Sequence, residues 1–130
     1  MTQINEHLFD SCFSLKSIQI PENVNYIDQK SFYDCVNFQS IQVPKNVHYI
    51  GNYAFYGCQS LKVIAIPEKV SKIEYRTFCR CSNLTSLHLH ENITKIMYGA
   101  FSYCSSLQNI TIPSKVSLLE ENIFYYCTSL

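Results

Sequence analysis

The sequence contains few charged residues and no cluster of charges of one sign. Charged residues make up 15% of the 130 residues, and ten basic side chains balance ten acidic ones. Nucleic-acid phosphates and anionic membrane surfaces are bound by clustered Lys and Arg. We therefore expect neither nucleic acid nor a membrane surface among the partners.

Long hydrophobic runs are also missing. No apolar stretch approaches the roughly 20 residues that span a bilayer, so we expect no membrane insertion within this segment. The N-terminal stretch MTQINEHLFDSC has neither the basic region nor the apolar core of a signal peptide. Apolar residues still make up 47% of the chain, which indicates a globular protein of one domain.

Catalytic motifs are not recognisable either. There is no Ser-His-Asp order, Gly-rich phosphate loop or paired-carboxylate motif. Of the four histidines only His88 and His90 are close, both expected on the outward face of one strand, and a zinc site needs three or four ligands. We expect no catalytic residue, metal site or cofactor, and hence no enzyme. The alternative is a metal-dependent or thiol enzyme that uses His88, His90 or Cys79.

What the sequence does contain is a repeat with a period of 23 residues. Phenylalanine recurs at Phe9, Phe32, Phe55, Phe78, Phe101 and Phe124. A cysteine follows three residues later, at Cys12, Cys35, Cys58, Cys81, Cys104 and Cys127. Three further residues on lies a large apolar side chain, at Leu15, Phe38, Leu61, Leu84, Leu107 and Leu130. A fixed period of this length is the signature of a stacked repeat architecture.

The cysteines form a column of the repeat rather than a disulfide framework. Equivalent side chains in a stack point the same way, and parallel Cβ vectors fit the disulfide dihedral poorly. We interpret the column as small buried hydrophobic residues. Cys79 lies outside the column, at a position where other repeats carry Asp10, Tyr33, Tyr56, Ser102 and Tyr125. It is therefore expected to point outward as a free thiol.

Within each repeat, the pattern L-x-x-I-x-I predicts a short strand. Proline follows it in four of the repeats and would end the strand because it has no N–H to donate. The next apolar pair, such as Val70 and Ile73, suits a turn or a brief extended segment on the opposite side. The piece Tyr53-Ala54-Phe55-Tyr56-Gly57-Cys58 fits a single helical turn. Five parallel strands are predicted near residues 17–20, 40–43, 63–66, 86–89 and 109–112.

The whole pattern resembles the BspA-like leucine-rich repeat family. The closest match is the stretch GNYAFYGC at 51–58, followed by Leu61, Ile64, Ile66 and Pro67. The resemblance implies a right-handed leucine-rich-repeat solenoid with a parallel sheet on its concave face and short turns or single helical turns on its convex side. It also implies a surface protein of a bacterium or protist that attaches to host proteins or neighbouring cells by binding.

We interpret residues 1–130 as a single domain of about 5.5 repeats, cut from a longer array. No polar capping repeat is recognisable at either end, and open solenoid ends expose apolar core. End-to-end self-association is therefore expected.

Outward positions of the predicted strands are the expected binding site, on the concave face. They are polar, small and nearly uncharged: Ser17, Gln19, Ser40, Gln42, Val63, Ala65, Ser86, His88, Asn109 and Thr111. The ten tyrosines gather on the loop side, where they either cover apolar surface or form a second contact surface.

These observations favour a non-enzymatic protein-binding or adhesion module at the cell surface or secreted. Its expected partner is a host extracellular-matrix or cell-surface protein. The alternative is an intracellular scaffold for protein–protein interaction in the cytoplasm, with the same binding face.

Overall fold

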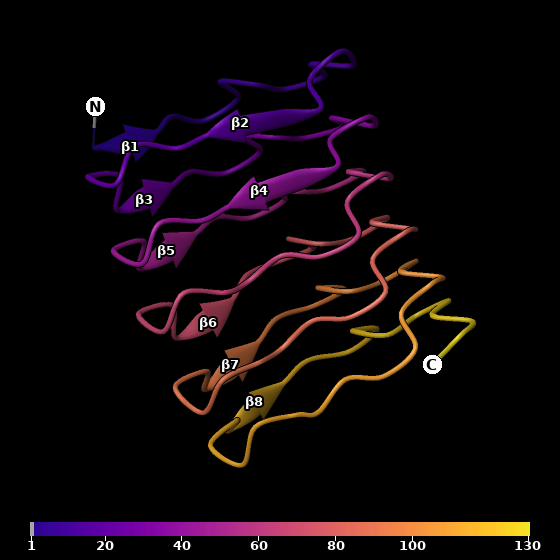
Figure 1. The fold of residues 1–130 in the computed structure, drawn as a ribbon. Helices are drawn as coiled ribbons and strands as arrows, with labels where there is room; N and C mark the ends of the chain where they lie inside the picture. The colour runs from indigo at the N-terminus through magenta and orange to yellow at the C-terminus, as the bar shows by residue number, and fades with distance from the viewer. Residues whose placement is uncertain (1) are drawn as a thin grey trace.

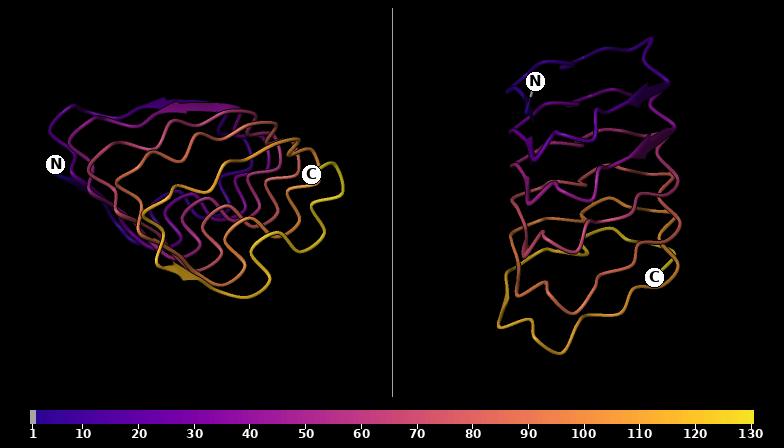
Figure 2. Two further views of the ribbon diagram at one scale, coloured as in Figure 1. Left: turned by 90° about the horizontal axis from the view of Figure 1, so that it is seen from below. Right: turned by 60° about the vertical axis from the view of Figure 1, so that its left-hand side comes forward.

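The computed structural model describes residues 2–130, which wind into a stack of similar coils. Successive coils lie side by side from the N-terminus to the C-terminus, with the short strands on two sides (Figures 1 and 2). Residues 2–130 contain no helix, and so none that could cross a membrane. The solenoid predicted from the 23-residue period is confirmed.

All strands are short and pair in parallel. They are β1 (Gln3–Ile4), β2 (Ser17–Gln19), β3 (Tyr26–Ile27), β4 (Ser40–Gln42), β5 (Tyr49–Ile50), β6 (Lys72–Ile73), β7 (Lys95–Ile96) and β8 (Leu118–Leu119). They form three sheets, in the orders β1-β3-β5, β2-β4 and β6-β7-β8. Each partner lies 23 residues away, for example Ile18 opposite Ile41 and Ile73 opposite Ile96. Each strand therefore pairs with the equivalent strand of a neighbouring repeat, one sequence period away.

The strand column predicted from L-x-x-I-x-I is confirmed for two of its five members. β2 and β4 form there, whereas the next three repeats have only isolated bridges, from Val63 to Ser86 and from Ser86 to Asn109. One bridging residue per repeat does not make a strand, because a strand needs consecutive bridges. The five-strand count is therefore not confirmed.

Most strands lie in the column that was predicted as a turn or brief extended segment. β1, β3 and β5 pair there in one sheet and β6, β7 and β8 in another. In β1, β3, β5, β6 and β7 the second residue is a buried isoleucine, and Tyr or Lys precedes it from β3 onward in this column. This alternation of outward and inward side chains is typical of a half-buried strand.

The single helical turn predicted for residues 53–58 is wrong. Tyr53 and Gly57 have positive φ angles of 57° and 71°, which a right-handed helix excludes. The N–H groups of Tyr53, Phe55 and Gly57 donate to the carbonyls of Tyr75, Thr77 and Cys79 in the next repeat. These donors are thus used between repeats and are not available for helical bonds within one repeat.

Stacked phenylalanines form the centre of the core. Neighbouring rings from Phe9 to Phe124 have centroids 5.2 to 5.8 Å apart and lie within 15° of parallel. Each ring belongs to a different repeat, so no repeat has a closed core of its own. The core is continuous along the stack, as expected for a solenoid.

The cysteine column lies beside the phenylalanines. Cys35, Cys58, Cys81 and Cys104 are buried, as predicted, and Cys12 and Cys127 in the outermost repeats are half-buried. From Cys35 onward each thiol donates to the carbonyl of the phenylalanine 26 residues earlier, at Sγ–O distances of 2.9 to 3.2 Å. This column therefore links each repeat to the one before it.

Candidate binding surfaces

All ten residues predicted on the concave face are exposed and lie on one side of the stack. We call them the strand face: Ser17, Gln19, Ser40, Gln42, Val63, Ala65, Ser86, His88, Asn109 and Thr111. Ser17 lies opposite Ser40 and Gln19 opposite Gln42 in the β2–β4 pair. Val63 is the most apolar member, and 57% of its surface is exposed. The structure thus assembles the predicted residues into one continuous, nearly uncharged surface.

Two shallow hollows lie along this face. One, of about 470 Å³, includes Gln42 and Ala65 and is bordered by Glu22, Lys45 and Glu68. The other, of about 420 Å³, includes Ser86, His88, Asn109 and Thr111 with Glu91 at its border. Charged side chains therefore stand at the edge of the face, and small polar ones stand within it.

The prediction that His88 and His90 share one outward face is wrong. His88 is exposed, but His90 is only 4% exposed. Its Nε2 lies 2.9 Å from the carbonyl oxygen of Pro67 in the preceding repeat. Position 90 belongs to the proline column, and Pro67 and Pro113 in that column are buried too. Strand alternation ends before this column, so the His90 ring packs at the edge of the core.

Residues 2–130 contain no group of three or more His, Cys, Asp or Glu side chains that could hold a metal ion. His88 is exposed on the strand face, and Cys79 lines a hollow of the loop side. The residues of the metal or thiol alternative are therefore not brought together.

Cys79 is not exposed, in contrast to the prediction. It is 3% exposed and lines a hollow of about 390 Å³ on the loop side. Burial raises the pKa of its thiol, although the positive charges of Arg76 and Arg80 act to lower it. The side chain is short enough to lie beneath its larger neighbours, whereas tyrosine at the same position of other repeats reaches the surface.

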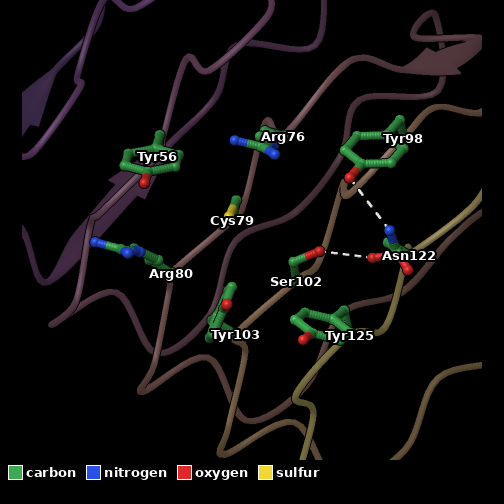
Figure 3. Close-up of a pocket in the computed structure, with 9 residues that line it drawn as sticks. All are labelled: Tyr56, Arg76, Cys79, Arg80, Tyr98, Ser102, Tyr103, Asn122 and Tyr125. Carbon is green, nitrogen blue, oxygen red and sulfur yellow. Dashed lines mark hydrogen bonds between the residues drawn. The ribbon is translucent and has the colours of Figure 1, made fainter.

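This hollow is an interruption in a column of tyrosines. Tyr33 and Tyr56 stack with centroids 4.7 Å apart and planes 4° from parallel. The next two repeats carry Cys79 and Ser102 instead, and the column resumes at Tyr125. Two consecutive positions of the column therefore carry no ring, and Cys79 and Ser102 form the floor of the hollow (Figure 3).

Both arginines of the chain stand at the sides of this space. The Arg76 guanidinium lies over the Tyr98 ring, 5.4 Å from its centroid. The Arg80 guanidinium lies between two rings, 5.8 Å from the centroid of Tyr56 and 5.6 Å from that of Tyr103. We call this site, with Asn122 beside Tyr98, the Tyr–Arg hollow (Figure 3).

Hydrogen bonding and charge fix the side chains around Arg76. Asn122 Nδ2 donates to the Tyr98 hydroxyl at 3.2 Å. This bond and the contact with Arg76 lower the pKa of Tyr98, and the Tyr98 phenol in turn raises the pKa of the Arg76 guanidinium. Arg76 is thus a permanent cation held over an aromatic ring.

The sequence pattern grouped the tyrosines on the loop side but did not identify this site. The sequence alone does not show that Arg76 and Arg80 form a pair. Both have a left-handed backbone, with φ of 48° and 62°, which residue type does not reveal. One signal was present in the sequence. Cys79 and Ser102 replace tyrosine in two successive repeats of one column.

Comparisons with known proteins agree with this architecture. The sequence profile of the BspA type Leucine rich repeat region matches residues 2–130 in six copies. No curated protein matches the chain.

Several solved structures are similar to the chain. A leucine rich cell surface protein from Faecalibacterium prausnitzii is 33% identical over 88% of this chain, with a TM-score of 0.84. The T. pallidum Leucine Rich Repeat protein is 27% identical over 89%, with a TM-score of 0.85. A leucine-rich repeat protein from Eubacterium ventriosum is 27% identical over 100%, with a TM-score of 0.86.

The chain spans only 30%, 56% and 35% of the length of these three proteins. The likeness thus describes a repeat array and not a whole surface protein. Six family repeats that cover nearly every residue, in the coil that the 23-residue period predicts, lead to one assignment. The chain belongs to the BspA-type leucine-rich repeat family.

Proposed function

We propose that this chain is the protein-binding part of a cell-surface adhesion protein and that it binds a host or neighbouring-cell protein through the strand face. The observation that supports this proposal best is that ten outward side chains from five repeats are all exposed on one side of the stack. Their small size lets a partner approach the backbone closely. Charged residues are confined to the edge of the surface.

The likeness to a leucine rich cell surface protein supports the location. Membership of the BspA-type leucine-rich repeat family supports a role in protein binding without catalysis. The strand face has no Trp, Tyr or Arg, the residues that dominate tight interfaces. We therefore expect affinities in the micromolar range for this segment alone, as is typical of interfaces without such anchors.

An array of immobilised extracellular-matrix and cell-surface proteins tests the proposal. The expected result is saturable binding that Ser40→Arg or Ser86→Arg weakens at least tenfold, because a long charged side chain then projects from the centre of the face. Ser71→Arg is the matched control, since Ser71 is exposed beside β6 on another side of the coil. An equal loss with all three variants, or no binding to any protein, would refute the proposal.

A second candidate function is an intracellular scaffold that uses the same face. The buried thiols favour it, because Cys58, Cys81 and Cys104 donate hydrogen bonds as thiols and would lose them on oxidation. Thiol titration of protein from its native source distinguishes the two locations. Extensive disulfide content would exclude the scaffold.

A further inference from the structure

We propose that the Tyr–Arg hollow is a second binding site and that it takes a tyrosine side chain of a partner peptide whose hydroxyl carries an oxyanion, either sulfate or phosphate. This site lies on the loop side, lined by residues outside the strand face. The proposal therefore does not depend on the function proposed above.

The shape of the hollow favours an aromatic ring. Tyr33 and Tyr56 show how rings of this column stack, at a centroid distance of 4.7 Å. Cys79 and Ser102 place no ring in the column before Tyr125, and the hollow lies at these two positions. A ring that enters this space can lie in the register of the column itself, where rings stack in the offset-parallel geometry that aromatic pairs prefer.

The charge of the hollow favours an anion on that ring. Its two guanidiniums belong to the only arginines of the chain. Within residues 2–130 neither has a carboxylate oxygen within 4.0 Å. Guanidinium groups bind sulfate and phosphate through paired N–H donors. Asp34, which the Arg80 charge influences, and Glu121, whose charge acts on Tyr98, are acidic residues near this site. Neither forms an ion pair with an arginine.

The arginines are also held in place before a ligand arrives. Arg76 lies over Tyr98, which Asn122 fixes by a hydrogen bond, and Arg80 lies between Tyr56 and Tyr103. Gly99 has φ of 63°, and a Cβ there would lie 3.1 Å from Arg76 Cγ. The glycine thus leaves the space that Arg76 needs to reach Tyr98. A preorganised pair of cations loses little side-chain entropy on binding.

A neighbouring hollow offers room for the peptide that carries the ring. It has a volume of about 320 Å³ and shares Arg80 and Tyr103 with the Tyr–Arg hollow. Its other side chains are the ring of Tyr126 and small or polar groups, among them Gln59 and Ser82. Residues that flank the modified tyrosine can therefore continue along the loop side.

Peptide binding measured by fluorescence anisotropy tests the proposal. Three labelled peptides of one neutral sequence carry tyrosine, O-sulfotyrosine or O-phosphotyrosine at the centre, and a uronic-acid oligosaccharide serves as an anion without an aromatic ring. We expect one or both modified peptides to bind at least tenfold more tightly than the unmodified one, a typical effect of charge-assisted hydrogen bonds. The preferred modification identifies the source of the ligand. Equal binding of all three peptides, no binding, or a preference for the oligosaccharide would refute the proposal.

Variants locate the binding. Ser102→Tyr restores tyrosine at one of the two positions without a ring and fills that part of the hollow, so it should abolish binding. Its control, Tyr33→Ser, removes a ring of the same column outside the hollow and should leave binding unchanged. Arg76→Gln should weaken the modified peptides roughly tenfold without affecting the unmodified one. Lys16→Gln removes a cation elsewhere as the control.

Circular dichroism establishes that each variant is folded. If Ser102→Tyr does not fold, Arg76→Gln and Arg80→Gln decide in its place. Retained affinity in a folded Ser102→Tyr variant, or in both arginine variants, would overturn the assignment.

Discussion

At the scale of single residues, position in the repeat decides what a side chain does. Cys58 and Cys79 are both buried, but Cys58 donates its thiol hydrogen to the Phe32 carbonyl, whereas Cys79 forms the floor of the Tyr–Arg hollow. Thr77 and Thr85 differ in the same way. Both hydroxyls donate to backbone carbonyls, but only Thr77 is buried.

The buried thiols make stability depend on alkaline pH. Burial raises the pKa of Cys35 to about 11 and raises those of Cys58 and Cys81 well above the ordinary value of a thiol. In the unfolded chain a thiol has a pKa near 8.5. Stability is therefore complete below about pH 8.5 and falls as pH rises toward the folded-state pKa, because the unfolded chain then releases protons that the folded chain retains.

Urea unfolding at pH 7.5, 9 and 10.5 measures this effect. We expect the free energy of unfolding to fall with pH and Cys35→Ala to reduce the fall. Val36→Ala, which removes a neighbouring half-buried apolar side chain, should lower stability but keep the full pH dependence. A pH dependence that Cys35→Ala leaves unchanged would contradict the assignment to the thiol.

Thr77→Val should destabilise the chain by about 1 kcal/mol more than Thr85→Val. Thr77 Oγ1 lies 3.0 Å from the Glu74 carbonyl and 3.3 Å from the Gly51 carbonyl, both in a buried environment. The exposed Thr85 hydroxyl can be replaced by water. Thermal and urea unfolding of the two variants measure the difference, and equal losses would show that the Thr77 hydroxyl contributes no more than an exposed one.

At the scale of elements, the loops as well as the strands form backbone hydrogen bonds between neighbouring repeats. The strands are two or three residues long, and each loop adds three bonds to the next repeat, such as those from Tyr53, Phe55 and Gly57. The phenylalanine stack lies directly inside these loops. The loop and the ring it carries thus form one structural unit.

Phe55→Ala should cost about 3 to 5 kcal/mol of unfolding free energy, the usual range for a buried phenylalanine. Phe55 stacks on Phe32 and Phe78 and has no exposed surface. Phe13→Ala is the matched control, because 57% of Phe13 is exposed, and its loss should be below about 1 kcal/mol. Chemical denaturation measures both. Similar losses of unfolding free energy in the two variants would show that a ring in the phenylalanine stack contributes no more to stability than an exposed ring.

The sequence predicted the core well and the loops badly, for a physical reason. The apolar columns of Phe55, Cys58 and Leu61 follow from the period, because inward positions tolerate only apolar side chains. Residue type gives no comparable signal for a positive φ at Tyr53 or Arg76. The burial of His90 also depends on where the chain bends after the strand. The alternation of side chains along the strand does not predict that position.

The two candidate sites also differ in how far the sequence predicts them. All ten residues of the strand face are exposed as predicted, because alternation along a strand places them outward. Whether they bind a partner stays a prediction. The Tyr–Arg hollow required the structure, because it depends on two missing rings and on arginines that approach from both sides.

At the scale of the whole molecule, apolar positions of the outer repeats are incompletely covered. Leu119 belongs to the column of Ile27, Ile50, Ile73 and Ile96, all of which are buried, but 53% of Leu119 is exposed. The isolated 130-residue chain should therefore associate at high concentration. Light scattering should show a mass that rises with concentration, and Leu119→Arg should reduce it. Lys95→Arg, at an exposed position that keeps its charge, is the control, and a strictly monomeric chain would contradict the expectation.

The one-way bonds between loops determine which assemblies are possible. N–H donors of each loop point to the following repeat and its carbonyls accept from the preceding one, as in the bonds from Phe55 to Thr77 and from Phe78 to Ala100. At the loops, the two ends of the stack are therefore chemically different, and like loop ends are not complementary. Addition that continues the loop bonds must be head-to-tail, a heterologous contact that gives open filaments where its rotation does not close, and not a closed twofold dimer.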